Sequence, residues 1–314
     1  MDKILITGAA GYLGSMISTH FLEKGYRVTG VDNLFYNKNT LNHLIKNKNF
    51  EFIKLDVRDQ RLYKDFVKKN DILFPLAGIV GAPLCDKNSK LAYEVNELAV
   101  KKISEFSSNN QLIIFPTTNS GYGTTSKDII CNEKMDLNPI SLYGKTKVNA
   151  EKFILQKNNS ISLRLATVFG VSFRNRVDLL VNFFVYNAVK FKKIKLFEPH
   201  FRRNYIHVKD VAFTFHHCLE NFNQMRSNIY NVGLSEANLT KLQLCKKIKE
   251  VIPDFEISID EKGEDPDKRD YFVSNEKLEM TNWKPKKSLK FGINELVKFY
   301  NLSKNLDLDK NYKL

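Results

Sequence analysis

The sequence lacks the features that mark exported, membrane-spanning and metal-binding proteins. Its 314 residues contain no apolar run near the roughly 18 residues of a membrane span. The N-terminus enters a strand-like segment directly, without the charged, apolar and small-residue regions of a signal peptide. The four cysteines form no Cys-x-x-Cys pair and stand near no histidine at metal-ligand spacing. We therefore expect a soluble cytoplasmic protein with free thiols, no metal site and no membrane contact.

The positive charge is large, but it is concentrated nowhere. The net charge is +14, and the lysines occur in short pairs along the whole chain. A nucleic-acid footprint usually gathers such charge on one face, helix or tail. We interpret the charge as a solvated surface that attracts small anionic substrates, and we expect no nucleic-acid partner.

Glycine is scarce at 14 residues, yet three glycines fall within one short turn that follows the apolar run Ile4–Ile6. In a strand-to-helix turn with this spacing, one glycine permits a sharp bend and one lets the backbone approach a pyrophosphate. The third lets helix and strand pack closely. Backbone N–H groups at the helix start then face the phosphates. The turn predicts dinucleotide binding by Gly8, Gly11, Tyr12, Leu13 and Gly14.

An acidic residue stands where dinucleotide-binding sites contact the ribose of the cofactor. Asp32 follows the strand-like run 27–31, about 20 residues after the glycine turn. Its carboxylate can accept hydrogen bonds from both ribose hydroxyls and would repel a 2′-phosphate. Asn33 comes next, and no arginine occupies the adjoining positions. The predicted cofactor is therefore NAD rather than NADP.

Short apolar runs alternate with amphipathic stretches, which predicts parallel β-α-β units. We expect an α/β fold with a doubly wound parallel sheet of about six or seven strands, and a ligand crevice beyond the carboxyl ends of the strands. The predicted strands are 3–7, 27–31, 50–54, 72–75, 111–117 and 161–165, with a further strand near 227–232. The predicted helices include 91–107, 143–155, 208–220 and 239–251.

A tyrosine and a lysine stand four residues apart at the start of one predicted helix, on the same face. Tyr143 has an ordinary pKa near ~10, too high for a base at neutral pH. The ammonium of Lys147 and a positive nicotinamide would stabilise its phenolate and lower that pKa. Tyr143 could then take a proton from a sugar hydroxyl while the carbon gives its hydride to NAD. At the end of the preceding strand, the hydroxyl of Thr118 could share that proton.

Together these motifs resemble the extended short-chain dehydrogenase/reductase family, and the match covers nearly the whole chain. Its members are mostly nucleotide-sugar epimerases, dehydratases and dehydrogenases. The resemblance implies that Thr118 is the catalytic Ser/Thr, Tyr143 the base and Lys147 its partner. It also implies that Asp56 and Val57 contact the adenine, and that Leu76, Ala77 and Gly78 line the cofactor. We expect a Rossmann domain over 1–170 and a smaller α/β substrate-binding cap over 171–314, with segments near 205–235 returning to the first domain.

The distal half carries further resemblances. Arg203 and Arg269 match family arginines that grip the nucleotide diphosphate, a role that suits the planar guanidinium fork. The stretch 174–182 resembles a polar substrate loop, which makes Arg176 and Asn182 candidates for substrate binding. His207 lies in a strand-like segment that enters a helix, and we expect it to be structural. The segment 262–270 is expected to be a loop, and 301–314 to be loosely held. The family also implies a homodimer through two helices of each subunit, including the helix of Tyr143.

Two departures from the family pattern narrow the reaction. Sugar 4,6-dehydratases place an Asp and a Glu after the catalytic Thr, because loss of water needs a further acid and base. This chain has Asn119 and Ser120 there, so we expect epimerisation or net oxidation at C4. Thr167 replaces an asparagine that many members use beside the sugar phosphate. Asn119 and Ser120 also resemble a branch with GDP-heptose 4-dehydrogenases, which implies a GDP-sugar substrate and polysaccharide biosynthesis.

Two alternatives stay open. Cys85 is either an acid/base group for carbon epimerisation or a packing thiol, and packing is the better supported interpretation. The whole protein is either a nucleotide-sugar enzyme or a noncatalytic NAD-sensing or RNA-binding regulator on the same fold. Because such regulators usually lose the Tyr-x-x-x-Lys pair, the presence of Tyr143 and Lys147 favours the enzyme.

Overall fold

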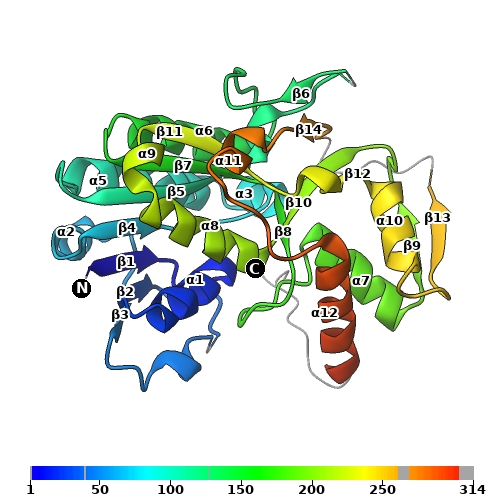
Figure 1. Cartoon of the computed structure of the whole chain (residues 1–314). Helices are drawn as coiled ribbons and strands as arrows, with labels where there is room; N and C mark the ends of the chain where they lie inside the picture. Colours follow the sequence, from blue (N-terminus) through cyan, green and yellow to red (C-terminus); the bar gives the residue numbers. More distant parts are fainter. Residues whose placement is uncertain (1, 39, 127, 261–268, 304–314) are drawn as a thin grey trace.

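The computed structural model describes residues 2–38, 40–126, 128–260 and 269–303 (Figure 1). At its centre is a seven-stranded sheet, parallel throughout. In spatial order the strands are β11 (Asn228–Val232), β7 (Ser160–Leu165), β5 (Leu112–Thr118), β4 (Ile72–Pro75), β1 (Lys3–Thr7), β2 (Arg27–Asp32) and β3 (Phe50–Lys54). The doubly wound α/β fold is therefore confirmed.

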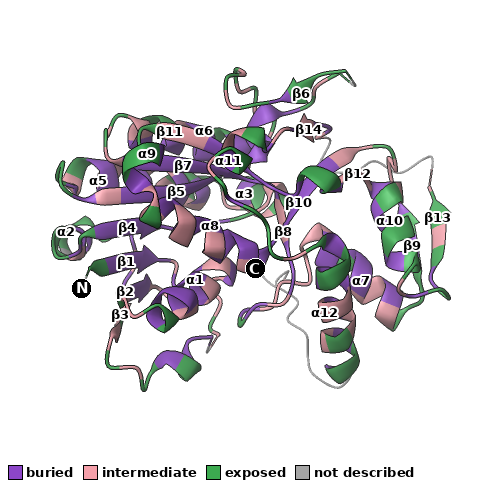
Figure 2. Cartoon of the chain, viewed as in Figure 1, coloured by how far each residue is buried: buried purple, intermediate pink, exposed green. Residues whose placement is uncertain are grey.

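The alternation of apolar side chains explains why helices cover both faces of the sheet. In β1, Ile4 and Ile6 pack with α1 (Tyr12–Glu23) and α8 (Val208–Glu220), whereas Leu5 faces the opposite cluster. That second cluster includes α2 (Gln60–Lys68), α5 (Ala99–Phe106) and α6 (Leu142–Leu155). Figure 2 shows the central strands almost wholly buried, as expected for parallel strands covered on both sides.

The C-terminal half adds smaller sheets and helices to the right of the main sheet in Figure 1. β8 (Thr167–Phe169), β10 (Arg202–His207) and β12 (Asn238–Thr240) form one sheet, and β9 (Lys193–Leu196) pairs with β13 (Glu256–Ile259). α7 (Leu180–Lys190) packs against α10 (Lys241–Lys249) and α12 (Leu289–Leu302). These helices share one buried cluster with α1 and α8, so the two halves have a continuous core.

The remaining elements are short and connect the larger ones. They are a 3₁₀ turn at Asn42–Leu44, α3 (Ala82–Lys87), α4 (Ser89–Tyr93), a π turn at Glu94–Leu98, a 3₁₀ turn at Asn119–Tyr122, β6 (Ile130–Cys131), α9 (Phe222–Met225), a 3₁₀ turn at Ser235–Ala237, β14 (Phe272–Val273) and α11 (Glu276–Glu279). β14 pairs with β6 in a small sheet of its own.

Two predicted helices differ from those observed. The helix predicted over 91–107 is interrupted by the π turn, which directs Asn96 toward the loop after β4. The helix predicted over 239–251 begins at Lys241, because Thr240 and Gln243 form a capping box that fixes its start. Helices α6 and α8 match the predicted bounds closely. Most of the predicted loop 262–270 and of the tail 301–314 lies outside the described residues.

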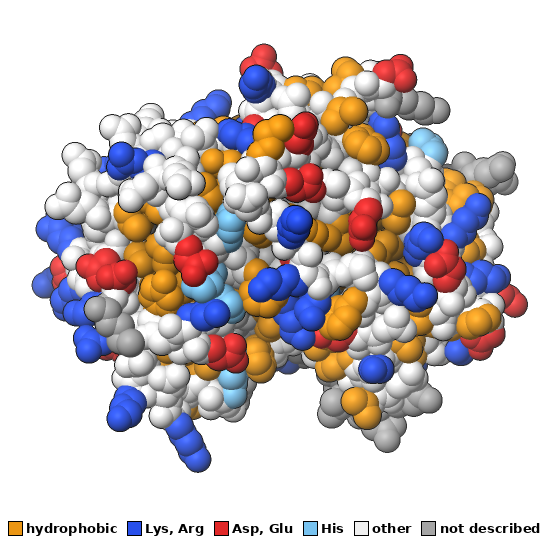
Figure 3. Space-filling model, viewed as in Figure 1, with side chains coloured by type: hydrophobic (Ala, Val, Ile, Leu, Met, Phe, Trp, Pro, Cys, Tyr) orange, Lys and Arg blue, Asp and Glu red, His pale blue; other side chains and the backbone are white. Residues whose placement is uncertain are grey.

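Among the described residues, no helix is both long and apolar enough to cross a membrane. No cluster of three or more His, Cys, Asp or Glu side chains in the same ranges could hold a metal ion. On the face shown in Figure 3, lysine and arginine side chains are interspersed with acidic ones.

Candidate active site

A cavity of about 750 Å³ lies beyond the carboxyl ends of the central strands. The ends of β1, β2, β4, β5 and β7 contribute to one wall, and loops of the C-terminal half contribute to the other. The position agrees with the general rule that doubly wound sheets bind ligands at the carboxyl ends of their strands.

The glycine turn forms a cradle that only glycine can line. A Cβ on Gly8 would lie 2.7 Å from the backbone nitrogen of Ala77, and one on Gly14 would lie 2.1 Å from the carbonyl oxygen of Gly8. Gly8 also has a φ of +70°, a left-handed conformation that favours glycine. Gly11 is the N-cap of α1, and the first turn of this helix, with its unpaired backbone N–H groups, lines the cavity. The cradle therefore fits the pyrophosphate of a dinucleotide.

Asp32 lies beside this cradle, at the end of β2. Its carboxylate accepts hydrogen bonds from the backbone N–H of Ala10 at 3.0 Å and of Leu34 at 2.7 Å. Burial raises the pKa of Asp32, and the two backbone bonds oppose that rise. The side chain is thus fixed in orientation at the place where a ribose would lie.

The adenine end of the predicted site is also assembled. Asn33 donates to the carboxylate of Asp56 at 3.0 Å, and Arg58 holds the same carboxylate. Hydrogen bonds from Arg58 lower the pKa of Asp56 to about 2. Asp56 and Val57 both line the cavity. Leu76, Ala77 and Gly78 line it as well.

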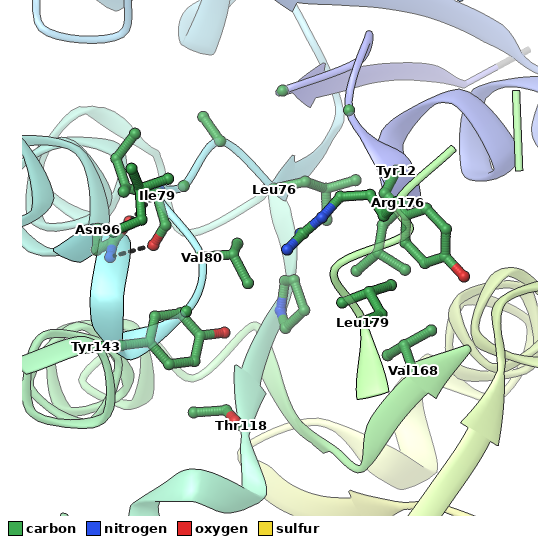
Figure 4. Close-up of a pocket in the computed structure, with 18 of the residues that line it drawn as sticks. Tyr12, Leu76, Ile79, Val80, Asn96, Thr118, Tyr143, Val168, Arg176 and Leu179 are labelled. Atoms are coloured by element: carbon green, nitrogen blue, oxygen red, sulfur yellow. Dashed lines mark hydrogen bonds between the residues drawn. The ribbon is translucent and has the colours of Figure 1, made fainter. Parts of the chain in front are cut away.

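The loop after β4 is held in place by two side chains. Thr7 accepts a hydrogen bond from the N–H of Ala77 at 3.2 Å. Asn96, from the π turn, accepts from the N–H of Ile79 at 2.8 Å and donates to its carbonyl at 2.9 Å. Figure 4 shows this contact at the cavity wall. π turns often occur at functional sites, and here the turn positions a cavity loop.

Thr118, Tyr143 and Lys147 come together at the same cavity, on β5 and α6. Ser141 caps α6 by accepting from the N–H of Gly144 at 3.1 Å, which places Tyr143 in the first turn. Figure 4 shows the Tyr143 hydroxyl pointing into the cavity with Thr118 nearby. A hydrogen bond from Thr118 acts on Tyr143 by lowering the pKa of its hydroxyl.

Burial dominates the electrostatics of this group. Burial raises the pKa of Tyr143 to about 12, although Arg269, Arg176 and the bond from Thr118 oppose the rise. Burial also lowers the pKa of Lys147 to about 7, which weakens its ability to stabilise a phenolate. In the cofactor-free protein the pKa of Tyr143 thus lies above its ordinary value, and its lowering by Lys147 together with the nicotinamide stays a prediction.

The predicted substrate residues divide into two groups. Ser120, Arg176, Arg203 and Arg269 line the cavity. Arg203 donates to the backbone carbonyl of Arg269, so these two arginines lie side by side. In Figure 4 the guanidinium of Arg176 points into the cavity that Tyr143 enters from the other side of the view.

Asn119 and Asn182 do not face the cavity, which corrects our expectation for both. Asn182 is buried in α7, where its amide bonds to the N–H of Gly170 at 3.0 Å and to the carbonyl of Arg176 at 2.9 Å. These bonds shape the loop before α7. Asn119 is fully buried in the 3₁₀ turn after β5 and is absent from the cavity lining.

The cavity lining also includes polar or aromatic residues that the sequence did not single out as candidates, among them Tyr36, Arg174, Lys241 and Tyr271. Arg174 and Tyr271 stood within stretches already singled out, next to the chosen arginines. Tyr36 and Lys241 carried no signal, because only the fold brings the loop after β2 and the start of α10 to the cavity.

Cys85 and His207 have structural environments. The thiol of Cys85 is fully buried and donates to the carbonyl of Ile79 at 3.3 Å, and burial raises its pKa to about 12. This supports the packing interpretation. His207 is the N-cap of α8, accepts from the N–H of Lys209 and contacts Glu295 at 3.0 Å, outside the cavity lining.

Comparisons with known proteins agree with this geometry. The model of the NAD dependent epimerase/dehydratase family matches residues 4–233. A dTDP-D-glucose 4,6-dehydratase of Dictyostelium discoideum is 27% identical over 272 residues, which cover 79% of this chain but only 62% of the relative. A CDP-paratose 2-epimerase of Salmonella typhi is 26% identical over 331 residues, covering 94% of this chain and 98% of the relative.

The fold also matches solved structures. The crystal structure of a UDP-glucuronic acid 4-epimerase from Bacillus cereus, in complex with UDP-glucuronic acid and NAD, superposes with a TM-score of 0.84. The two sequences are 21% identical, and the match covers 96% of this chain and 99% of the epimerase. At this identity the likeness concerns the fold alone.

Proposed function

Because the chain belongs to the NAD dependent epimerase/dehydratase family, whose model matches residues 4–233, we propose that it oxidises C4 of a nucleoside-diphosphate sugar. The reaction either releases the 4-keto sugar or returns the hydride to the opposite face of C4, giving the epimer. When bound, NAD accepts the hydride and its positive ring favours the tyrosinate. The observation that carries the proposal is the placement of Tyr143 and Thr118 in one cavity with Arg203 and Arg269.

The roles of the chain's own residues follow from their positions. The phenolate of Tyr143 takes the proton of the C4 hydroxyl, and Thr118 hydrogen-bonds the same oxygen. Arg203 and Arg269 bind the diphosphate, since guanidinium pairs with phosphate oxygens in a bidentate manner. Ser120 and Arg176 orient the sugar between these two ends. Asp32 fixes the adenosine ribose and disfavours a 2′-phosphate.

Dehydration is the less favoured reaction. The relatives of this chain include a 4,6-dehydratase, so family membership alone does not separate dehydration from epimerisation or oxidation. The residues after Thr118 do, because Asn119 and Ser120 supply neither the acid nor the base that removal of water across C5 and C6 requires. Asn119 also lies outside the cavity lining. For the substrate we propose a GDP-sugar, a GDP-heptose in particular, on the resemblance of this Asn-Ser pair.

Purified protein incubated with a panel of UDP-, GDP-, dTDP- and CDP-sugars tests the reaction. An unchanged product mass with altered chromatographic retention indicates epimerisation, a mass lower by two hydrogens indicates the 4-keto sugar, and loss of water indicates dehydration. Absence of any product, together with tight RNA binding, would favour the noncatalytic regulator. We also propose a homodimer through α6 and a second helix, which light scattering of the same preparation tests.

A further inference from the structure

The loop between β8 and α7 crosses the N-terminus of α1. The hydroxyl of Tyr12 donates to the carbonyl of Gly170 at 2.7 Å, and Ser172 donates to the carbonyl of Tyr12 at 2.8 Å. Ser172 also contacts Ser15 at 3.3 Å. These bonds tie a loop of the C-terminal half to the first turn of the helix that carries the glycine cradle. Arg174 follows two residues later and lines the same cavity.

The side chain of Arg174 is buried and forms no ion pair with a carboxylate within the described residues. Arg174 is 8% exposed, and its guanidinium carbon lies 3.6 Å from the centroid of the Tyr36 ring. Its Nε is buried and has no hydrogen-bond partner within the described residues. The nearby carboxylate of Asp178 is engaged by Arg176. Such a buried cation is costly unless an anion reaches it.

The carboxylates near Arg174 do not outweigh the cost of burying its charge. Burial lowers the pKa of Arg174, and the neighbouring charge of Arg176 lowers it further. The positive charge of Arg174 also lowers the pKa of Asp32, although the two side chains form no ion pair. The ribose 2′ position is a poor site for an added phosphate, because the Asp32 carboxylate would repel it. The anion that fits this position is the pyrophosphate at the N-terminus of α1.

We propose that Arg174, held in place by its stack on Tyr36, closes over the pyrophosphate of bound NAD and slows release of the cofactor. The loop of Arg174 is bonded to the first turn of α1 through Ser172 and Tyr12, and that turn lines the same cavity as Arg174. This inference rests on the NAD dependence of the family and not on the proposed sugar oxidation. An NAD-binding measurement therefore tests it even if no sugar reacts.

Isothermal titration of cofactor-stripped protein with NAD, ADP-ribose and adenosine is the test. Arg174→Gln should lower the affinity for NAD and for ADP-ribose by at least about tenfold, the scale of one charge-assisted hydrogen bond. Adenosine, which has no phosphate, should bind unchanged. Arg174→Lys keeps the positive charge but not the planar guanidinium, and it should lose less NAD affinity than Arg174→Gln. Tyr36→Leu removes the ring on which the guanidinium stacks, and it should also lower NAD affinity. High salt should reduce the difference in NAD affinity between the wild type and Arg174→Gln, because it screens the charge of the guanidinium.

The control is Arg226→Gln, which alters an exposed arginine whose side chain donates to Asn159 and which does not line the cavity. Unchanged NAD affinity in Arg174→Gln would overturn the proposal. So would an equal loss for adenosine, which indicates a distorted cavity, or a loss confined to nucleotide sugars, which indicates a substrate contact. Wild-type preference for NADP that disappears in Arg174→Gln would assign the guanidinium to a 2′-phosphate instead. If Arg174→Gln does not fold, Arg174→Lys and Tyr36→Leu carry the same comparison.

Discussion

The ammonium of Lys147 lies 4.1 Å from the centroid of the buried Phe115 ring, at the wall of the cavity. The ring face offsets part of the cost of burying the charge, and Glu151 favours the charged form. Burial nevertheless lowers the pKa of Lys147 to about 7. A lysine in this position costs stability, which is the pattern expected of a group kept for function.

Replacing Lys147 by methionine should therefore stabilise the cofactor-free protein at neutral and lower pH. The folded-state pKa lies below that of the unfolded chain, so the unfolded state binds more protons between these values. The free energy of unfolding of the wild type should thus rise with pH between these two pKa values. The stability advantage of Lys147→Met should shrink over the same range. Each unit of pKa difference corresponds to about 1.4 kcal/mol.

Urea unfolding at several pH values measures this effect, with Lys145→Met on the exposed face of α6 as the matched control. Lys145→Met should change stability little at any pH. A destabilised Lys147→Met protein at pH 6 would contradict the interpretation. The same variant should lose turnover, because it removes the lysine that the family resemblance pairs with Tyr143.

Tyr143→Phe should abolish hydride transfer while leaving folding and NAD affinity intact, since it removes only the hydroxyl that takes the proton. The difference in ultraviolet absorbance between wild type and this variant also reports the ionisation of Tyr143. We expect a pKa near 12 in cofactor-free protein and a lower pKa once NAD is bound, because of the positive nicotinamide. Tyr93→Phe, at an exposed position, is the control. Retained turnover in Tyr143→Phe would exclude the proposed role.

The sheet was predictable because its strands are short segments rich in apolar and β-branched residues that alternate with helical stretches. Ile72–Pro75, for example, is apolar throughout, and it is buried throughout. The glycine turn was predictable for a similar reason, since contacts with Ala77 and with Gly8 leave no space for a Cβ.

What the sequence could not supply was the direction of side chains in the loops. Asn182 and Arg174 stand in one polar stretch, but Asn182 turns inward to bond Gly170 while Arg174 lies in the cavity. Nor could it supply the desolvation of Tyr143 and Lys147, which depends on everything packed around them. The π turn that directs Asn96 likewise has no signature in the apolar periodicity.

Asp32→Asn should lower the preference for NAD over NADP by about tenfold or more, because it removes the charge that repels a 2′-phosphate and weakens the ribose contact. The ratio of the two dissociation constants, measured by titration, checks this. Asp65→Asn, at an exposed position on α2, should leave the ratio unchanged. An unchanged ratio in Asp32→Asn would place the ribose elsewhere.

The ion pair between Arg164 and Glu151 should be essential for stability, because it joins β7 to the helix of Tyr143. The two groups lie 2.7 Å apart, and each side chain is only 4% exposed. Arg164→Met leaves a buried carboxylate without its partner and should destabilise the protein by about 3–5 kcal/mol. Replacing both, by Arg164→Met with Glu151→Leu, removes the unpaired charge and should cost clearly less than the sum of the single changes. Urea unfolding of the four proteins measures the coupling. Additive losses would mean that the pair does not act as a unit, and that Tyr122, which accepts from Arg164 at 3.1 Å, is the more important partner.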